Sequence, residues 1–81
     1  MRVTVRLFAA HREAAGTSTF EADLPAGATV SDAFASVCGS FPGIEKSTRV
    51  PAFALNQAHV QADAPLADGD EVAILPPVAG G

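Results

Sequence analysis

The residues best suited to chemistry are the last two, Gly80 and Gly81. A terminal carboxyl group has a pKa of about 3.3 to 3.7, so it is ionised at neutral pH and is a poor acceptor for a nucleophile. Attack of this carboxylate on the α-phosphate of ATP would give an acyl-adenylate, from which a persulfide sulfur displaces AMP to leave a thiocarboxylate. Glycine has no Cβ, so two glycines can enter a narrow channel in another protein. The sequence therefore predicts that the reactive group is the end of the chain itself.

The preceding residues are suited to presenting this end. Pro76-Pro77 stops a sheet and favours an extended conformation, and Val78-Ala79 completes the spacer. Residues 76–81, at about 3.3 Å each, reach about 20 Å. We expect residues 1–75 to form a domain and residues 76–81 to form a tail that enters a partner's cleft. An ordinary frayed end is the weaker interpretation, because the diproline follows a strand pattern directly.

Other side chains offer little competing chemistry. His11 and His59 lie far apart in the sequence and neither has a metal-ligand neighbour at a typical spacing, so we expect no metal site. Cys38 lies on an apolar helical stripe and is expected in the core. We expect His11 and Arg12 on the exposed side of a short helix and assign them no function. The carboxylates around residues 63–71 are interpreted as a solvated turn, with docking to a basic partner as the alternative.

Composition limits the class of protein. With 81 residues, 48% of them hydrophobic and 17% charged, the chain suffices for one folded domain. A single cysteine suits a reducing compartment, and neither a signal peptide nor a membrane-spanning run is present, so a cytoplasmic location without a membrane partner is expected. A net charge of −4 argues against nucleic acid as a partner.

The first half of the chain predicts a hairpin and a helix. Residues 2–8 alternate as a half-buried strand, residues 9–15 favour a short helix that ends at Gly16, and residues 20–24 alternate again. Thr29 and Asp32 form a weak capping box before an apolar stripe of helical spacing. We expect this helix to end near residues 39–41 and the two strands to pair.

The second half predicts a loop and three strands. Residues 40–50 are interpreted as a loop in which Ile44 packs back on the core. Strands are expected around residues 53–55, 59–61 and 71–75, with turns at residues 56–57 and 68–70. This order predicts an α+β fold of the β-grasp, ubiquitin-like type, with a mixed sheet on one main helix and the first and last strands side by side at the centre.

Three segments, residues 7–16, 56–57 and above all 65–81, resemble the sulfur carriers of the ubiquitin-like β-grasp family, and most closely the small subunits of molybdopterin synthase. The resemblance spans nearly the whole chain. It implies that the carboxylate of Gly81 is adenylated by a partner similar to ubiquitin-activating enzymes and is then converted into a thiocarboxylate with sulfur from a donor. ATP is used by that partner, and no cofactor is expected on the chain itself.

The same resemblance implies that the charged tail enters the large catalytic subunit of molybdopterin synthase. There it would donate sulfur to cyclic pyranopterin monophosphate in molybdenum cofactor biosynthesis, within a heterotetramer of two large and two small subunits. The chain would thus be a sulfur-donor subunit and no enzyme when isolated. Residues 76–80, namely Pro76, Pro77, Val78, Ala79 and Gly80, are expected to bind the partner.

Phe8 shares strand parity with Arg2, Thr4 and Arg6, and Leu75 shares parity with Ala73. If the two strands are neighbours, Phe8 and Leu75 form an apolar docking patch beside the tail; the alternative is that they fold into the edge of the core. Two other functions stay open at this point. One is sulfur transfer to another pathway, such as thiamine, cysteine or thiolated tRNA synthesis, and the other is a ubiquitin-like protein modifier.

Overall fold

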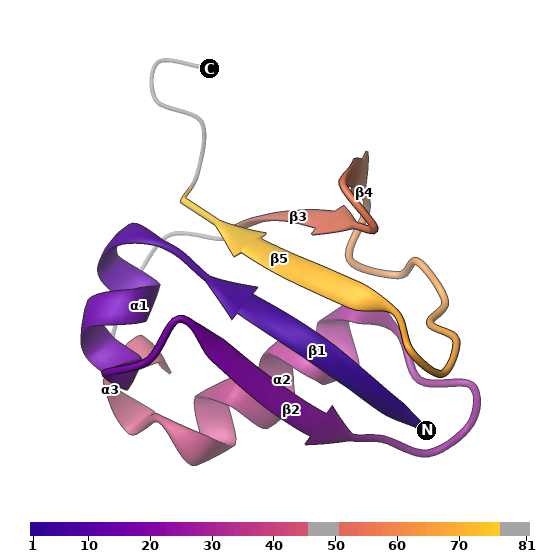
Figure 1. Ribbon diagram of the computed structural model, residues 1–81, viewed down its shortest axis with the longest axis horizontal. Helices are drawn as coiled ribbons and strands as arrows, with labels where there is room; N and C mark the ends of the chain where they lie inside the picture. The colour runs from indigo at the N-terminus through magenta and orange to yellow at the C-terminus, as the bar shows by residue number, and fades with distance from the viewer. Residues whose placement is uncertain (46–50, 77–81) are drawn as a thin grey trace.

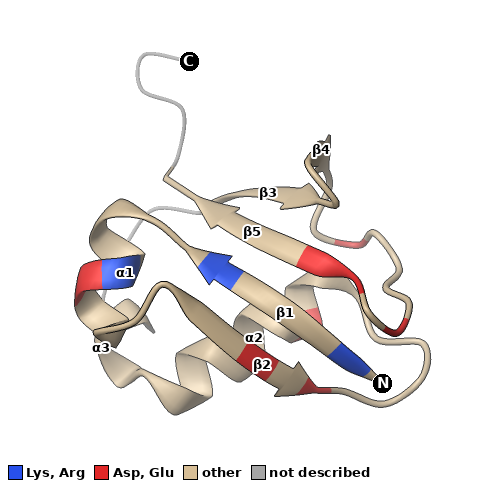
Figure 2. Ribbon diagram, in the orientation of Figure 1, with Lys and Arg blue, Asp and Glu red and all other residues tan. Residues whose placement is uncertain are grey.

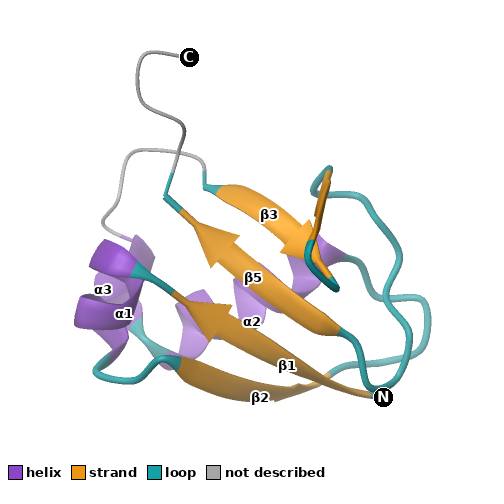
Figure 3. Cartoon of the chain, turned by 45° about the horizontal axis from the view of Figure 1, so that its top comes forward, coloured by secondary structure: helices purple, strands orange, loops and turns teal. Residues whose placement is uncertain are grey.

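The structure, a computed structural model, describes residues 1–45 and 51–76 and has an α+β architecture, as predicted. A five-stranded sheet carries its helices on one face (Figure 1; Figure 3). The elements in chain order are β1 (Arg2–Leu7), α1 (Ala9–Ala15), β2 (Thr19–Asp23), α2 (Val30–Ser40), α3 (Pro42–Glu45), β3 (Ala52–Leu55), β4 (Ala58–Val60) and β5 (Glu71–Leu75). Within the described ranges, no helix is long and apolar enough to cross a membrane.

The sheet has the strand order β2-β1-β5-β3-β4. Strands β1 and β5 are parallel and adjacent, with Val5 opposite Val72, whereas the other pairs are antiparallel. This confirms the predicted mixed β-grasp sheet with the first and last strands side by side near its centre. The predicted pairing of the first two strands is also confirmed, although the whole of α1 lies between them in the chain.

The core lies between the sheet and α2. Val3, Val5 and Leu7 of β1 alternate with exposed or half-buried residues, and Val72 and Ile74 alternate in the same way in β5. They meet the buried residues of α2, which are Val30, Ala33, Val37 and Cys38. Full burial of a Val or Leu side chain contributes about 1.5 to 3 kcal/mol, so this layer fixes which face of each strand looks outward. The predicted core position of Cys38 is confirmed.

Helix α2 begins with the predicted capping box. The backbone N–H of Thr29 donates to Oδ2 of Asp32 over 2.8 Å, and the backbone N–H of Asp32 donates to Oγ1 of Thr29 over 3.4 Å. The prediction that residues 40–50 form only a loop was wrong, because Pro42–Glu45 form the short helix α3. Proline is tolerated in the first turn of a helix, where its missing N–H is not needed. Ile44 packs back into the core, as expected.

Two turns join the last three strands. Asn56 and Gln57, with φ of 49° and 74°, form the two-residue turn between β3 and β4, as expected for a hairpin with left-handed central residues. Strand β4 begins at Ala58, one residue before the predicted strand. Gly69, with φ of 87°, forms the predicted turn before β5, whose bounds agree with the prediction.

Candidate functional site

The candidate site lies at the edge of the sheet where β1 and β5 both end. Because these strands are parallel, with Leu7 opposite Ile74, the residues that follow them leave the sheet at the same edge (Figure 1). Phe8 follows Leu7 and Leu75 follows Ile74. Leu75 is half-buried, and Pro76 after it is exposed. The predicted site residues Pro77, Val78, Ala79, Gly80 and Gly81 lie outside the described residues.

Phe8 lies outside the strand in which it was predicted. It is the N-terminal cap of α1, and its backbone is extended, with φ of −134° and ψ of 158°. Its carbonyl oxygen accepts hydrogen bonds from the backbone N–H groups of His11 over 3.1 Å and Arg12 over 3.3 Å. Among residues 1–45 and 51–76 it is the one exposed large hydrophobic residue, with 36% of its surface accessible. Such a residue, beside the end of β5, is a candidate anchor for a partner.

The left-handed backbone of Ala9 forms the sharp bend at this point. Its φ of 50° is uncommon for a residue other than glycine, asparagine or aspartate and carries a conformational penalty of about 1 kcal/mol. The bend lets the chain leave β1 at Leu7 and enter α1 immediately after Phe8. The direction of Phe8 is therefore set by two constraints, the strand before it and the helix after it.

Sequence reasoning missed a row of small side chains next to Leu75. On the sheet face opposite the helices, Ala73 of β5 lies opposite Ala54 of β3, which lies opposite His59 of β4. Leu75 lies opposite Ala52 in the next row. An open pocket of about 440 Å³, lined by residues 51–53 and 59–62, borders Ala52 on its far side. Ala52, Ala54 and Ala73 form a flat surface of small side chains, which we call the small-residue floor. The alternation of alanine with Phe53 and Leu55 in β3 is the sequence pattern that indicates it.

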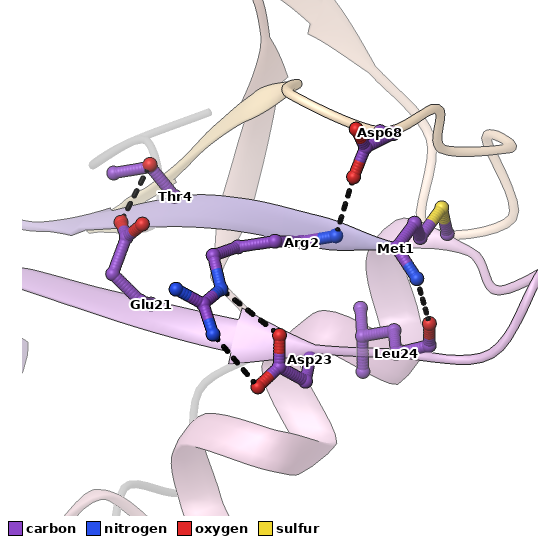
Figure 4. Close-up of polar contacts among 7 residues, drawn as sticks. All are labelled: Met1, Arg2, Thr4, Glu21, Asp23, Leu24 and Asp68. Carbon is purple, nitrogen blue, oxygen red and sulfur yellow. Dashed lines mark hydrogen bonds and ion pairs between the residues drawn. The ribbon is translucent and has the colours of Figure 1, made fainter.

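The opposite end of the same sheet face is charged (Figure 2). Arg2 forms two contacts with Asp23, with Nε to Oδ1 at 3.0 Å and Nη2 to Oδ2 at 3.2 Å, and the hydroxyl of Thr4 donates to Oε2 of Glu21 over 2.6 Å (Figure 4). The hydrogen bond from Arg2, together with its positive charge, lowers the pKa of Asp23. These pairs are exposed and contribute little to stability. They do divide the face into a charged end and an apolar end.

Arg6 lies at the boundary between the two ends. Its Nη1 is 3.5 Å from Oε2 of Glu71, and both side chains are partly exposed. Arg6 lies opposite Ala73, so it is the charged neighbour of the small-residue floor.

Two carboxylates of the acidic turn, interpreted from the sequence only as a solvated turn, accept hydrogen bonds from the backbone. Oδ1 of Asp68 accepts the backbone N–H of Arg2 over 2.7 Å. Oδ2 of Asp70 accepts the backbone N–H of Ala67 over 2.8 Å and its Oδ1 accepts Nδ2 of Asn56 over 3.1 Å, so these two bonds lower the pKa of Asp70. Within residues 1–45 and 51–76, no group of three or more His, Cys, Asp or Glu side chains could hold a metal ion.

The prediction that His11 is exposed was wrong. Only 6% of its surface is accessible, and its ring lies edge-on to that of Phe34, with 6.2 Å between the ring centroids. Arg12 is exposed, as expected. A seven-residue helix is too short to show a periodic stripe of apolar residues, so the sequence does not indicate which face of α1 packs against the rest of the domain. Burial lowers the pKa of His11.

Comparisons with known proteins agree with this geometry. The ThiS family matches residues 5–81. The molybdopterin synthase sulfur carrier subunit of Chlamydomonas reinhardtii is 40% identical over 83 residues, covering 100% of both chains. The subunit with the same name from Arabidopsis thaliana is 31% identical over 81 residues, covering 100% of this chain and 84% of its own length.

Solved structures extend the comparison. SAMP1, small archaeal modifier protein 1, of Haloferax volcanii superposes with a TM-score of 0.88 at 30% identity over 100% of both chains. A chain in the complex of subunits 1 and 2 of molybdopterin-converting factor from Helicobacter pylori superposes with a TM-score of 0.66 at 29% identity, again over 100% of both chains. The predicted resemblance to ubiquitin-like sulfur carriers is thus confirmed, and the chain belongs to the ThiS family.

Proposed function

We propose that this chain is the sulfur carrier subunit of a molybdopterin synthase and that Gly81 carries the sulfur. One observation above all supports the proposal: the match to a relative of that name runs over the full length of both chains. The position of Phe8 supports it further, because this exposed residue follows β1, the strand that runs parallel to β5, and Pro76 follows β5.

The proposed chemistry proceeds in three steps on the partner enzyme. A carboxylate oxygen of Gly81 attacks the α-phosphate of ATP, and pyrophosphate leaves. A persulfide sulfur then attacks the acyl carbon and AMP leaves, after which reduction of the resulting acyl disulfide by a thiol releases the thiocarboxylate. The folded domain provides the surface that binds the activating enzyme, and residues 76–80 span the distance to the active site of that enzyme. We further propose that the charged tail delivers sulfur to cyclic pyranopterin monophosphate inside a large subunit, in an assembly of two large and two small subunits.

Docking is proposed to use the apolar end of the open sheet face. Phe8 follows β1, Leu75 ends the neighbouring strand β5, and the half-buried Ala52 and Ala73 lie beside Leu75 on the open sheet face, where a partner's side chains can pack closely. A chain similar to this one occurs with subunit 2 in the Helicobacter pylori complex, which supports a large subunit as the partner.

A second candidate function is protein modification. The high TM-score to SAMP1, which is named as a modifier, favours it specifically. In that case the acyl carbon of Gly81 would be transferred to a lysine amine and would form an isopeptide bond. Both functions share the acyl-adenylate, so only the product separates them.

The intact mass of the chain tests both functions. The protein is incubated with a cognate activating enzyme, ATP and a sulfur source, and we expect one oxygen-for-sulfur exchange at Gly81. Addition of the large subunit and the pterin precursor should reverse the exchange. Adducts on target lysines would instead support the modifier, and an exchange that only another pathway's acceptor reverses would reassign the recipient.

Two variants control this experiment. Gly81→Ala adds a Cβ where the channel is expected to be narrow and should abolish loading without loss of folding. Gly39→Ala is the matched control, because a Cβ at this exposed helical position meets nothing within 4 Å. Loading of Gly81→Ala at the wild-type rate would contradict the proposed role of the diglycine end.

A further inference from the structure

Helix α1 packs against the domain on the side that carries His11, its one buried residue, and Ala15. Ala15 is half-buried, whereas the other five residues of the helix are exposed. A helix of seven residues is marginal on its own, so its packing decides whether it is formed. The stability of α1 therefore depends on the state of a titratable group.

The surroundings of the imidazole favour its neutral form. Its ring lies at 88° to that of Phe34 in α2, and within residues 1–45 and 51–76 its buried Nδ1 has no hydrogen-bond partner. A neutral imidazole leaves one ring nitrogen as an acceptor, whereas the protonated ring has a donor N–H on both nitrogens. In the protonated ring Nδ1 always carries a proton, so it would be a buried donor without an acceptor among the described residues, and the ring would be a buried charge; each of these disfavours the packed state.

The other titratable groups near α1 do not provide a partner for Nδ1. Within the helix, Arg12 and Glu13 are exposed. On the helices packed against it, the titratable residues are Asp32 and Cys38 in α2 and Glu45 in α3. Asp32 is hydrogen-bonded in the capping box at the start of α2.

The helix in turn holds Phe8 in place. The backbone N–H groups of His11 and Arg12 both donate to the carbonyl of Phe8, so the first turn of α1 fixes this residue beside the end of β5. We infer that His11 is a positioning residue for docking: when neutral it holds α1 and Phe8 in place, and when protonated it releases them, so that partner binding weakens as the pH falls. The inference rests on the proposed docking role of Phe8.

The first test uses the isolated full chain and needs no partner. NMR titration of the His11 ring should show that it protonates below its ordinary pKa of 6.5. Hydrogen exchange of the α1 amides, corrected for the intrinsic pH dependence, should show the population of the open helix rising by up to about tenfold between pH 7.5 and 5.5, if the released His11 has its ordinary pKa of 6.5.

Substitutions separate titration from packing. His11→Leu keeps an apolar anchor of similar size and should remove the pH dependence of α1 exchange; His11→Met serves the same purpose should the leucine variant fail to fold. His59→Gln is the matched control and should behave like the wild type. The inference is overturned if the His11 ring titrates at or above its ordinary pKa of 6.5, or if the wild type and the apolar variant show the same pH dependence of α1 exchange.

The second test measures affinity for the large subunit across the same pH range. We expect the dissociation constant of the wild type to rise with falling pH by several-fold more than that of His11→Leu. Equal slopes would overturn the docking part of the inference. Failure of the proposed function would give a different result. Gly81 would not be loaded with sulfur even in an assay at one fixed pH, and the titration of the His11 ring would be unchanged.

Discussion

Substitution of Phe8 by alanine should weaken binding of the large subunit about 10-fold. A phenylalanine residue has a surface of about 200 Å², so the 36% that is accessible corresponds to about 70 Å² available for burial by a partner. At about 25 cal/mol per Å² this is about 1.8 kcal/mol, or about 20-fold in affinity. This is an upper limit, because alanine retains part of the contact.

Isothermal titration calorimetry with the large subunit measures this effect, and urea unfolding checks that each variant is folded. Phe20→Ala is the matched control, because Phe20 is also partly buried but packs edge-on to Phe41 at 5.5 Å on the helix-covered side of the sheet. The control should lose stability and keep its affinity. A change of less than about twofold for Phe8→Ala, or an equal loss of affinity in both variants, would refute the docking patch.

Three further substitutions test the structure itself. Thr29→Ala removes the hydroxyl that accepts the Asp32 N–H and should lower the free energy of unfolding by about 1 kcal/mol in urea denaturation; an unchanged value would show that the capping box contributes nothing. Gln57→Gly relieves a φ of 74° and should raise the midpoint of thermal unfolding, whereas a lower midpoint would argue against the turn geometry. The lowered pKa of Asp70 means that its stabilisation is present above its ordinary pKa of 3.8 and is lost as the pH falls through the folded value. Acid unfolding below about pH 4 should therefore be steeper for the wild type than for Asp70→Ala, and parallel curves would contradict this.

Elements with strong local patterns could be predicted from the sequence. Strand β5 has an alternating core face and is bounded by a turn glycine and by Pro76, so its limits follow from short-range chemistry. Helix α1 ends at Gly16 in the left-handed conformation, as glycine at that position indicated. The expectation that the first and last strands are neighbours rested on the fold type, and it was correct, whereas the proposed patch of Phe8 and Leu75 stays a prediction.

Features that depend on packing between distant segments could not be predicted. Helix α3 is four residues long, and Pro42 and Gly43 in it favour a loop on local grounds, yet Ile44 is almost fully buried and keeps the segment against the core. The burial of His11 depends on where Phe34 lies, 23 positions along the chain (34 − 11). The floor of Ala52, Ala54 and Ala73 needs the register between β3 and β5, which the sequence of each strand does not specify.

The central position of β5 has a consequence for how the domain is made. This strand is the last to be synthesised, yet it lies between β1 and β3, so without it the sheet consists of two separate strand pairs. An isolated two-stranded pair is at best marginally stable in water. A nascent chain in which residues 71–75 have not yet been synthesised therefore has no complete hydrophobic core. The domain must fold largely after its last strand leaves the ribosome.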